Sequence, residues 1–273
     1  MVGQNTLIGN INNLIEHKQF PRFAIICGTR GSGKKELCKY IAESLDVFWC
    51  YEPDCKVETV RNAIWDAYRV YSPTLYVFAD ADNMSIQARN SLLKVTEEPP
   101  KNAYFIMTLE DINNTLPTIR SRAVVFQMDT YNVNELIEYG LSLSTNYQHH
   151  AMISELCETP GEVKYLLEIG ADEFYEYVHK VFDNIAAVSG PNAFKIAANL
   201  SLKENTTGYD LKLFLKAFKV ICWKAYLESK DEDYKDAVYI TSMALRKCSN
   251  KSINKQMVFD MWLLQIREAW LWK

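Results

Sequence analysis

One short stretch near the N-terminus combines glycines and a lysine at a spacing suited to holding phosphate. Residues 28–34 read Gly-Thr-Arg-Gly-Ser-Gly-Lys, which fits the pattern G-x-x-x-x-G-K. Glycines let consecutive backbone N–H groups curl around an anion, and a following helix adds the partial positive charge of its N-terminus. The Lys34 side chain would reach the outer phosphates of a nucleotide. The residues expected to contact it are Gly28, Gly31, Ser32, Gly33, Lys34 and Lys35.

The position after Lys34 departs from what magnesium binding requires. A serine or threonine hydroxyl there would ligate Mg²⁺, whereas Lys35 is positively charged and offers no acceptor. We therefore expect ATP or ADP as the ligand of this loop, with magnesium held poorly. The alternative is a glycine loop of chance composition, against which the flanking strand and helix patterns argue.

A second candidate group follows the apolar run at residues 75–78. In nucleotide-hydrolysing folds two acids belong at the end of such a strand, where the first holds magnesium and the second orients the attacking water. Here the first place is Ala79 and the second is Asp80, so we interpret Asp80 as a degenerate acidic site. The alternative for Asp80 and Asp82 is a strand end followed by a helix cap.

Strand and helix patterns alternate through the first 130 residues. Short apolar runs predict strands at 23–27, 46–51, 75–78, 104–107 and 124–126. Helical periodicity marks residues 37–45, 57–71 and 86–97. This alternation predicts an α/β fold with a largely parallel sheet covered on both faces. Ligands bind at the carboxyl ends of such strands, so the glycine loop, Asp80 and Thr108 are expected to converge on one nucleotide.

Strand patterns fade from residue 130 onward, and helical periodicity replaces them. We therefore predict that the α/β domain covers residues 1–129 and that two helical parts follow, at 130–189 and 190–273. The second boundary is set at Gly190-Pro191, because that pair interrupts a helix.

Composition excludes several classes of protein for this 273-residue chain. A share of 48% hydrophobic and 23% charged residues is typical of globular proteins. The net charge of −4 argues against a strongly cationic nucleic-acid binder. No apolar run is long enough to span a membrane, and the N-terminus lacks a signal-peptide pattern. We therefore expect a cytoplasmic protein without a membrane partner.

The seven cysteines are scattered, as is typical of a reducing compartment. Cys50 and Cys55 are the closest pair in the sequence. A zinc site needs a matching second pair or nearby histidines, so no zinc or other metal site is expected.

Two longer motifs in the first domain are specific enough to carry a family resemblance. Residues 90–100 read NSLLKVTEEPP, and residues 116–122 read LPTIRSR. They resemble the motifs N-[SA]-L-L-K-x-x-E-E-P-P and L-P-T-I-x-S-R-C of AAA+ clamp-loader subunits, most closely the delta-prime subunit of bacterial DNA polymerase III. Gly-Lys-Lys at 33–35 also occurs in delta-prime sequences, and Val-Gly-Gln at 2–4 resembles the family's start. The resemblance covers roughly residues 2–128.

The resemblance implies an AAA+ phosphate-loop domain, a helical lid and an all-α C-terminal collar that mediates oligomerisation. In that family, delta-prime acts as a stator in a heteropentameric ring that opens a sliding clamp and loads it onto primed DNA. The resemblance also implies that Arg122 points into a neighbouring subunit's ATP site as an arginine finger. Hydrolysis by this chain itself is then expected to be weak or absent.

The departures from the family keep alternatives open. Ala123 stands where the family has cysteine, Ala79 replaces the magnesium-binding aspartate of motor subunits, and Lys164 is the nearest cation to Gly161 where motor subunits carry a sensing arginine. One alternative is an active motor ATPase that uses Asp80 as a substitute base. A second is a stand-alone AAA+ adaptor outside the polymerase complex. Arg122 could instead form an ordinary ion pair, and Lys34 could serve only to fill the loop.

Overall fold

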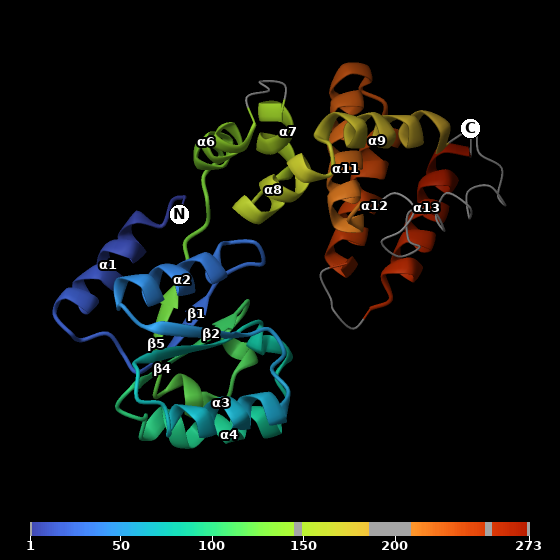
Figure 1. Cartoon of the computed structure of the whole chain (residues 1–273). Coiled ribbons are helices and arrows are strands. Elements are labelled where there is room, and N and C mark those ends of the chain that lie inside the picture. Colours follow the sequence, from blue (N-terminus) through green and yellow to red (C-terminus); the bar gives the residue numbers. More distant parts are fainter. Residues whose placement is uncertain (1, 145–148, 186–208, 249–252, 272–273) are drawn as a thin grey trace. The chain divides into compact units, whose positions relative to one another are not determined.

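Five short apolar runs form one parallel sheet in a computed structural model of the chain (Figure 1). The strands are β1 (Phe23–Cys27), β2 (Phe48–Glu52), β3 (Thr74–Phe78), β4 (Ala103–Leu109) and β5 (Val124–Gln127). They are hydrogen-bonded in the order β2-β3-β4-β1-β5. Every residue of β1 and β3 is buried, which is expected when helices cover both faces of a parallel sheet.

Two pairs of helices cover the sheet (Figure 1). The helices α1 (Asn5–Glu16) and α2 (Lys34–Ser44) pack on one face, and α3 (Val57–Ala67) and α4 (Ile86–Glu97) pack on the other. Successive strand residues point to opposite faces, so Ile25 joins the cluster under α3 and α4 while Ile26 joins the cluster under α1 and α2. The predicted α/β layering is confirmed.

The bounds of most elements follow the sequence patterns closely, and a few details differ. The helix predicted at residues 57–71 ends at Ala67. The second strand begins at Phe48 rather than at Asp46, because Asp46 adopts a left-handed turn conformation with φ of 53°. Three short helical turns were not predicted: η1 (Ala81–Asn83), η2 (Ile112–Asn114) and α5 (Pro117–Arg120).

The remaining described elements are all helices. They are α6 (Val133–Leu143), α7 (His149–Leu156), α8 (Pro160–Glu168), α9 (Ala171–Ile185), α11 (Leu211–Ser229), α12 (Glu232–Cys248) and α13 (Lys255–Leu271). Aromatic side chains fill the core between α11 and α13, where Phe214 and Phe218 meet Trp262 nearly at right angles. The buried indole N–H of Trp262 donates to the Thr241 hydroxyl of α12 over 2.9 Å. The predicted helical C-terminal part is confirmed.

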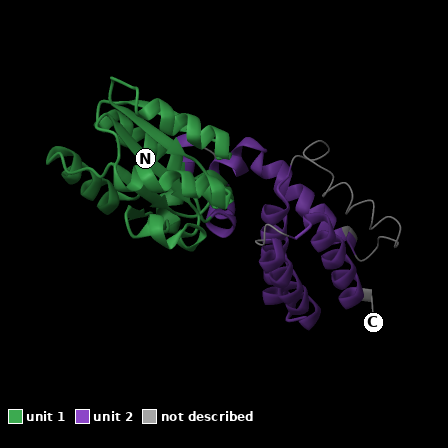
Figure 2. Cartoon of the chain, turned by 90° about the horizontal axis from the view of Figure 1, so that it is seen from below, with its two compact units in different colours: residues 1–139, 158–162 green, residues 140–157, 163–273 purple. Residues whose placement is uncertain are grey.

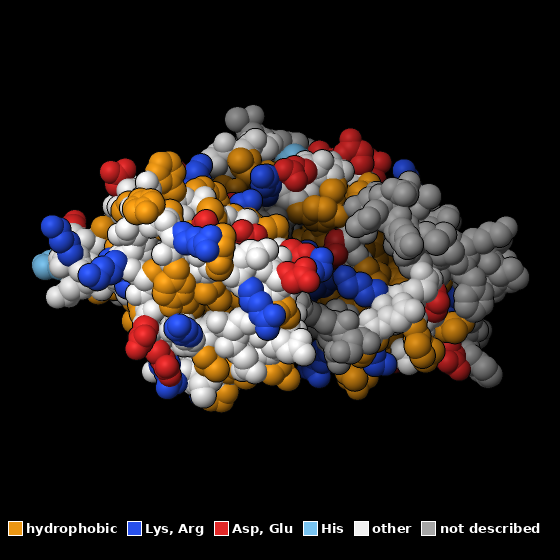
Figure 3. All heavy atoms as spheres, turned by 60° about the horizontal axis from the view of Figure 1, so that its bottom comes forward, with side chains coloured by type: hydrophobic (Ala, Val, Ile, Leu, Met, Phe, Trp, Pro, Cys, Tyr) orange, Lys and Arg blue, Asp and Glu red, His pale blue; other side chains and the backbone are white. Residues whose placement is uncertain are grey.

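The structure describes residues 2–144, 149–185, 209–248 and 253–271. The chain divides into two compact units, one of residues 1–139 and 158–162 and the other of 140–157 and 163–273 (Figure 2). The predicted boundary at Gly190-Pro191 lies outside the described residues, and the three-part division stays a prediction. Among the described helices, none has the length and apolar character needed to cross a membrane. On the face seen in Figure 3, basic side chains are scattered among acidic and hydrophobic ones.

Candidate nucleotide site

The glycine-rich loop connects the carboxyl end of β1 to the start of α2. Gly31 and Gly33 have φ of 81° and 90°, a conformation that residues with a side chain rarely adopt. A Cβ atom at Gly28 would lie 2.9 Å from the Ser32 hydroxyl and 3.0 Å from Cβ of Met128. The loop therefore requires its glycines for conformation at two positions and for space at a third.

The ammonium group of Lys34 lies inside this loop. Its Nζ donates to the carbonyl oxygens of Gly28 at 2.7 Å and Thr29 at 2.9 Å. The residue is 8% exposed, and this burial lowers the pKa of the ammonium group below its ordinary value. The carboxylates of Glu110 and Asp80 act in the opposite direction. The lysine of the G-x-x-x-x-G-K pattern is thus a buried cation near two acidic residues, Asp80 after β3 and Glu110 after β4.

Ser32 connects the glycine loop to a later segment of the chain through side-chain and backbone contacts. Its hydroxyl donates to the sulfur of Met128 at 3.4 Å, and its carbonyl oxygen accepts a hydrogen bond from the Tyr131 hydroxyl. Its backbone N–H donates to the Thr29 carbonyl at 3.2 Å. Ser32 therefore ties the loop to the segment that follows β5, a role that the motif does not reveal.

Lys35 is held by an aromatic ring. Its Nζ lies 4.5 Å from the ring centroid of Tyr51 on β2, within range of a cation–π interaction. Where a hydroxyl would ligate magnesium, the chain therefore presents a positive charge. This charge would repel a metal cation at the start of α2.

Asp80 and Thr108 lie at the same edge of the sheet as the loop, because β3, β4 and β1 are neighbours. Asp80 has a φ of 47°, and its backbone N–H donates to the hydroxyl oxygen of the buried Thr108 at 3.0 Å. Its carboxylate is exposed and makes no capping hydrogen bond to η1. Ala79 is buried and carries no metal-binding group. The glycine loop, Asp80 and Thr108 thus lie at the same ends of their strands. The first of the two acids is missing, because Ala79 stands in its place.

Asp82 has a structural role that sequence reasoning missed. Its carboxylate accepts hydrogen bonds from the N–H groups of Glu110 at 2.8 Å and Asp111 at 3.3 Å, and from the Asn114 amide at 2.9 Å. These donors belong to the segment after β4, about 30 positions further along the chain. The acid therefore fastens that segment to the end of β3.

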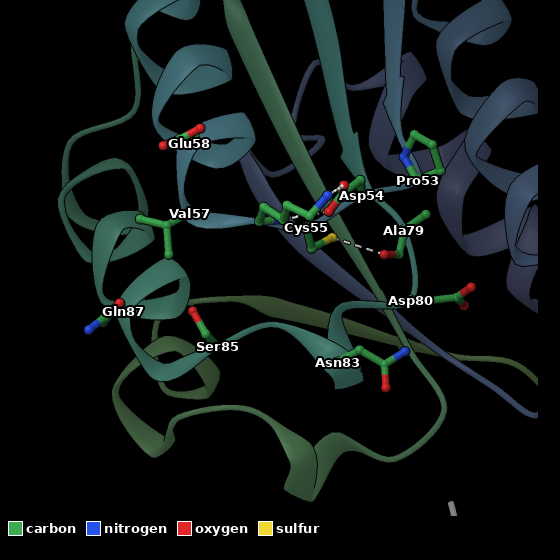
Figure 4. Close-up of a pocket in the computed structure, with 11 residues that line it drawn as sticks. Pro53, Asp54, Cys55, Val57, Glu58, Ala79, Asp80, Asn83, Ser85 and Gln87 are labelled. Carbon is green, nitrogen blue, oxygen red and sulfur yellow. Dashed lines mark hydrogen bonds and ion pairs between the residues drawn. The ribbon is translucent and has the colours of Figure 1, made fainter.

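A cleft of about 740 Å³ lies next to Asp80, between the β2–α3 connection and the start of α4 (Figure 4). Within it the Cys55 thiol donates to the Ala79 carbonyl at 3.0 Å. Burial raises the pKa of Cys55 to about 12, so this thiol stays protonated at neutral pH. In the described part of the chain, no three histidine, cysteine or acidic side chains are grouped so as to hold a metal ion.

A later segment of the chain also contacts the glycine loop. The backbone N–H of Gly161 donates to the Gly31 carbonyl at 2.9 Å. A Cβ atom at Gly31 would lie 2.6 Å from the Thr159 hydroxyl, so the two segments touch closely. The contact of the Thr-Pro-Gly sequence at 159–161 with a loop about 130 residues earlier was not recognisable from the sequence. Lys164, the cation considered at this position, is exposed and lies 3.7 Å from Glu168.

Arg122 lies near the amino ends of the strands, whereas the glycine loop lies at their carboxyl ends. In the register of β1 and β5, Ala24 pairs with Val124. Arg122 therefore precedes the amino end of β5, whereas Gly28 follows the carboxyl end of β1. Its guanidinium donates to the Thr118 carbonyl at 2.9 Å and contacts the Glu97 carboxylate at 2.9 Å. Arg122 is thus not brought together with the other predicted site residues within this chain.

Part of the chain matches a known protein family. Residues 56–132 match the sequence model of a family described as DNA polymerase III, delta subunit. The chain is 22% identical over 246 residues to DNA polymerase III subunit gamma of Buchnera aphidicola subsp. Schizaphis graminum, covering 76% of this chain and 61% of that protein. It is 26% identical over 150 residues to the replication factor C small subunit of Methanosphaera stadtmanae, covering 50% and 46%. The chain is thus similar, at low identity, to subunits of DNA polymerase III and of replication factor C.

The chain spans between 45% and 61% of the length of three gamma subunits to which it is similar. Solved structures establish the fold more completely. A DNA polymerase III gamma subunit-related protein from Thermotoga maritima has a TM-score of 0.54 at 16% identity, covering 96% of this chain and 99% of that one. The Holliday junction branch migration motor RuvB from Thermotoga maritima has a TM-score of 0.54 at 15% identity, covering 97% and 88%. The predicted AAA+ fold is confirmed.

Proposed function

We propose that this AAA+ chain is a delta-prime-like stator of a DNA-replication clamp loader and that it supplies Arg122 in trans to a neighbour's ATP site. The observation that carries the proposal is the register of β1 and β5. Gly28 lies four residues beyond Ala24, a distance of roughly 13 Å at about 3.3 Å per residue, and Arg122 lies before the partner of Ala24. An arginine side chain does not span that distance, so a nucleotide contacted by Arg122 would belong to another chain.

Arginine suits this role because its planar fork can hold two phosphate oxygens and stays charged at neutral pH. The side chain of Arg122 is 39% exposed, so a neighbouring subunit can reach it. The segment that carries it is the LPTIRSR motif, whose resemblance to clamp-loader subunits suggested the role.

The chain's own loop is proposed to bind ATP or ADP while hydrolysing it weakly or not at all. The conformations of Gly31 and Gly33 suit a phosphate cradle, and Lys34 can supply positive charge to it. Magnesium fits poorly, because Lys35 and Ala79 replace both protein groups that would hold it. A metal that neutralises and positions the phosphates would therefore bind weakly.

The proposed partners are the other clamp-loader subunits of a heteropentameric ring, the sliding clamp and, through the assembly, primed DNA. The C-terminal collar, residues 190–273, would mediate assembly. Its aromatic core is present where the residues are described, between α11, α12 and α13. The proposed location is the cytoplasm.

The test is a reconstituted clamp loader with clamp and primed DNA, comparing Arg122→Ala with wild type. We expect the ATPase rate of the assembly to fall at least about tenfold, the loss of about 1.4 kcal/mol of transition-state stabilisation. The matched control is Arg120→Ala, because Arg120 is an exposed arginine two residues earlier, at the end of α5, and its guanidinium donates to the Asn113 side chain at 3.3 Å. An unchanged rate for Arg122→Ala in a normally assembled loader would refute the trans role.

A motor ATPase that uses Asp80 as its base is the second candidate, favoured by the exposure of Asp80 at the end of β3, where its backbone N–H donates to the Thr108 hydroxyl. ATP hydrolysis by the isolated chain distinguishes the two. Turnover of about 1 s⁻¹ or faster, which is typical of working enzymes, would favour the motor. Turnover far below this value, with ATP still bound, would favour the stator.

A further inference from the structure

Glu97 and Arg122 come from different elements and meet at the amino edge of the sheet. Glu97 is the last residue of α4, and Arg122 follows α5. The distance between Arg122 Nη2 and Glu97 Oε1 is 2.9 Å. On the other side of the guanidinium, Nη1 donates to the Thr118 carbonyl at 2.9 Å. The guanidinium is thus held between a carboxylate and a backbone carbonyl.

We propose that Glu97 is a positioning residue that presents Arg122 in one orientation to the neighbouring subunit's nucleotide. This inference rests on the proposed trans role of Arg122. Glu97 does not touch the nucleotide in this account. It acts by restricting where the guanidinium can lie before the subunits meet.

The location of Glu97 indicates that it does not serve its own helix. The carboxyl end of a helix carries partial negative charge, so an acid there is unfavourable and a base is favoured. The last turn of α4 carries Lys94, which meets that preference. Glu97 lies at the unfavourable end, and the partner that the structure gives its side chain is Arg122.

Restricting Arg122 beforehand has a physical benefit. An exposed arginine loses rotamer freedom when it binds, and that entropic cost weakens each contact it makes. A guanidinium already held by Glu97 and Thr118 loses less freedom on meeting a phosphate. Guanidinium has five N–H donors in a rigid fork. The pair with Glu97 can therefore persist while other donors reach phosphate oxygens.

The test uses the assembled loader with clamp and primed DNA. We expect Glu97→Ala to lower kcat about threefold with the KM for ATP unchanged, a modest loss in keeping with a partly exposed ion pair. Glu97→Gln keeps a hydrogen-bond acceptor and should lie between wild type and Glu97→Ala. The matched control is Glu98→Ala, because Glu98 is the next residue and is also exposed. We expect it to match wild type.

A double-mutant cycle separates positioning from a general structural role. In the Arg122→Ala background, Glu97→Ala should cause no further loss of kcat. An equal loss in both backgrounds would overturn the inference, as would wild-type activity of Glu97→Ala. If Arg122→Ala alone has no effect, the proposed function fails first. If Arg122→Ala is defective and Glu97→Ala is not, the proposed function stands and the positioning role of Glu97 fails.

Discussion

The backbone N–H of Gly161 donates a hydrogen bond to the carbonyl oxygen of Gly31 across a gap that leaves no room for a side chain. A Cβ atom at Gly161 would lie 2.7 Å from Cα of Gly31 and 3.0 Å from its carbonyl oxygen. Because both are backbone atoms, they cannot rotate away. We expect Gly161→Ala to lower the free energy of unfolding by about 1–3 kcal/mol and to weaken nucleotide binding at the loop.

Urea unfolding and ATP titration of the purified chain measure these two effects. Gly9→Ala is the control, since a Cβ atom there meets nothing within 4 Å on the α1 helix. Replacing that helical glycine should raise stability by about 0.5–1 kcal/mol. Equal stabilities of Gly161→Ala and wild type would show that the two backbone segments can separate freely.

A second prediction concerns the missing magnesium ligands. Lys35→Thr combined with Ala79→Asp should make ATP affinity depend on Mg²⁺, since a hydroxyl and a carboxylate then face the same phosphates. Calorimetric titration of ATP with and without Mg²⁺ measures this. Lys35→Ala is the control, because it removes the charge without adding a ligand. If the ATP affinity of the double variant did not depend on Mg²⁺, then residues other than these two would also be preventing magnesium binding.

The C-terminal helices offer a test of one buried hydroxyl, that of Thr241, which accepts from the Trp262 indole N–H and donates to the Ala237 carbonyl at 2.7 Å. Thr241→Val keeps the shape of the side chain and removes the acceptor of the Trp262 indole N–H. A buried donor left without a partner costs about 1–3 kcal/mol, so the free energy of unfolding should fall by that amount. Thr241→Ser keeps the hydroxyl and should be closer to wild type. Urea unfolding of the three proteins decides whether the hydroxyl or the volume matters.

Stability should also fall at alkaline pH because of Cys38 on α2. Burial raises the pKa of this thiol from 9.0 to about 12. A group with a raised pKa in the folded state contributes stability fully below its unfolded pKa, and this contribution is lost as the pH rises from about 9 to about 12. For this one proton the free energy of unfolding should decline by up to about 1.4 kcal/mol per pH unit.

Urea unfolding at several pH values between about 8 and 10.5 measures that decline, since it begins near the thiol's ordinary pKa. Cys38→Ala removes the titrating group, so its stability should depend less steeply on pH than that of wild type. Parallel pH profiles for the two proteins would assign the alkaline loss to other groups.

Sequence patterns were sufficient where a feature depends on neighbouring residues. The bounds of α4 were predicted fully, because Ser85 caps its start by accepting from the Ala88 N–H and Pro99 follows its end. The residues at the strand ends were also predicted to meet, since parallel strands bring their carboxyl ends to one edge.

Features that join distant segments could not be predicted in this way. The carboxylate of Asp82 reaches donors about 30 positions later, and Gly161 contacts a loop 130 positions earlier. The hold of Glu97 on Arg122 spans 25 positions and two helices. No local pattern encodes such pairs, because they arise when the sheet brings separate connections together.

The register that separates Gly28 from Arg122 has a consequence for how such a chain can change over time. Gly28 and Arg122 lie at opposite ends of the neighbouring strands β1 and β5, and every residue of β1 is buried. A substitution beside the loop, such as lysine at position 35, therefore leaves the guanidinium and its carboxylate undisturbed. Under the proposed function, residues around the glycine loop can change without loss of function, whereas Arg122 has to be kept because a neighbouring subunit needs it. Such a chain could complete the ATP site of one neighbouring subunit while having no working ATP site of its own.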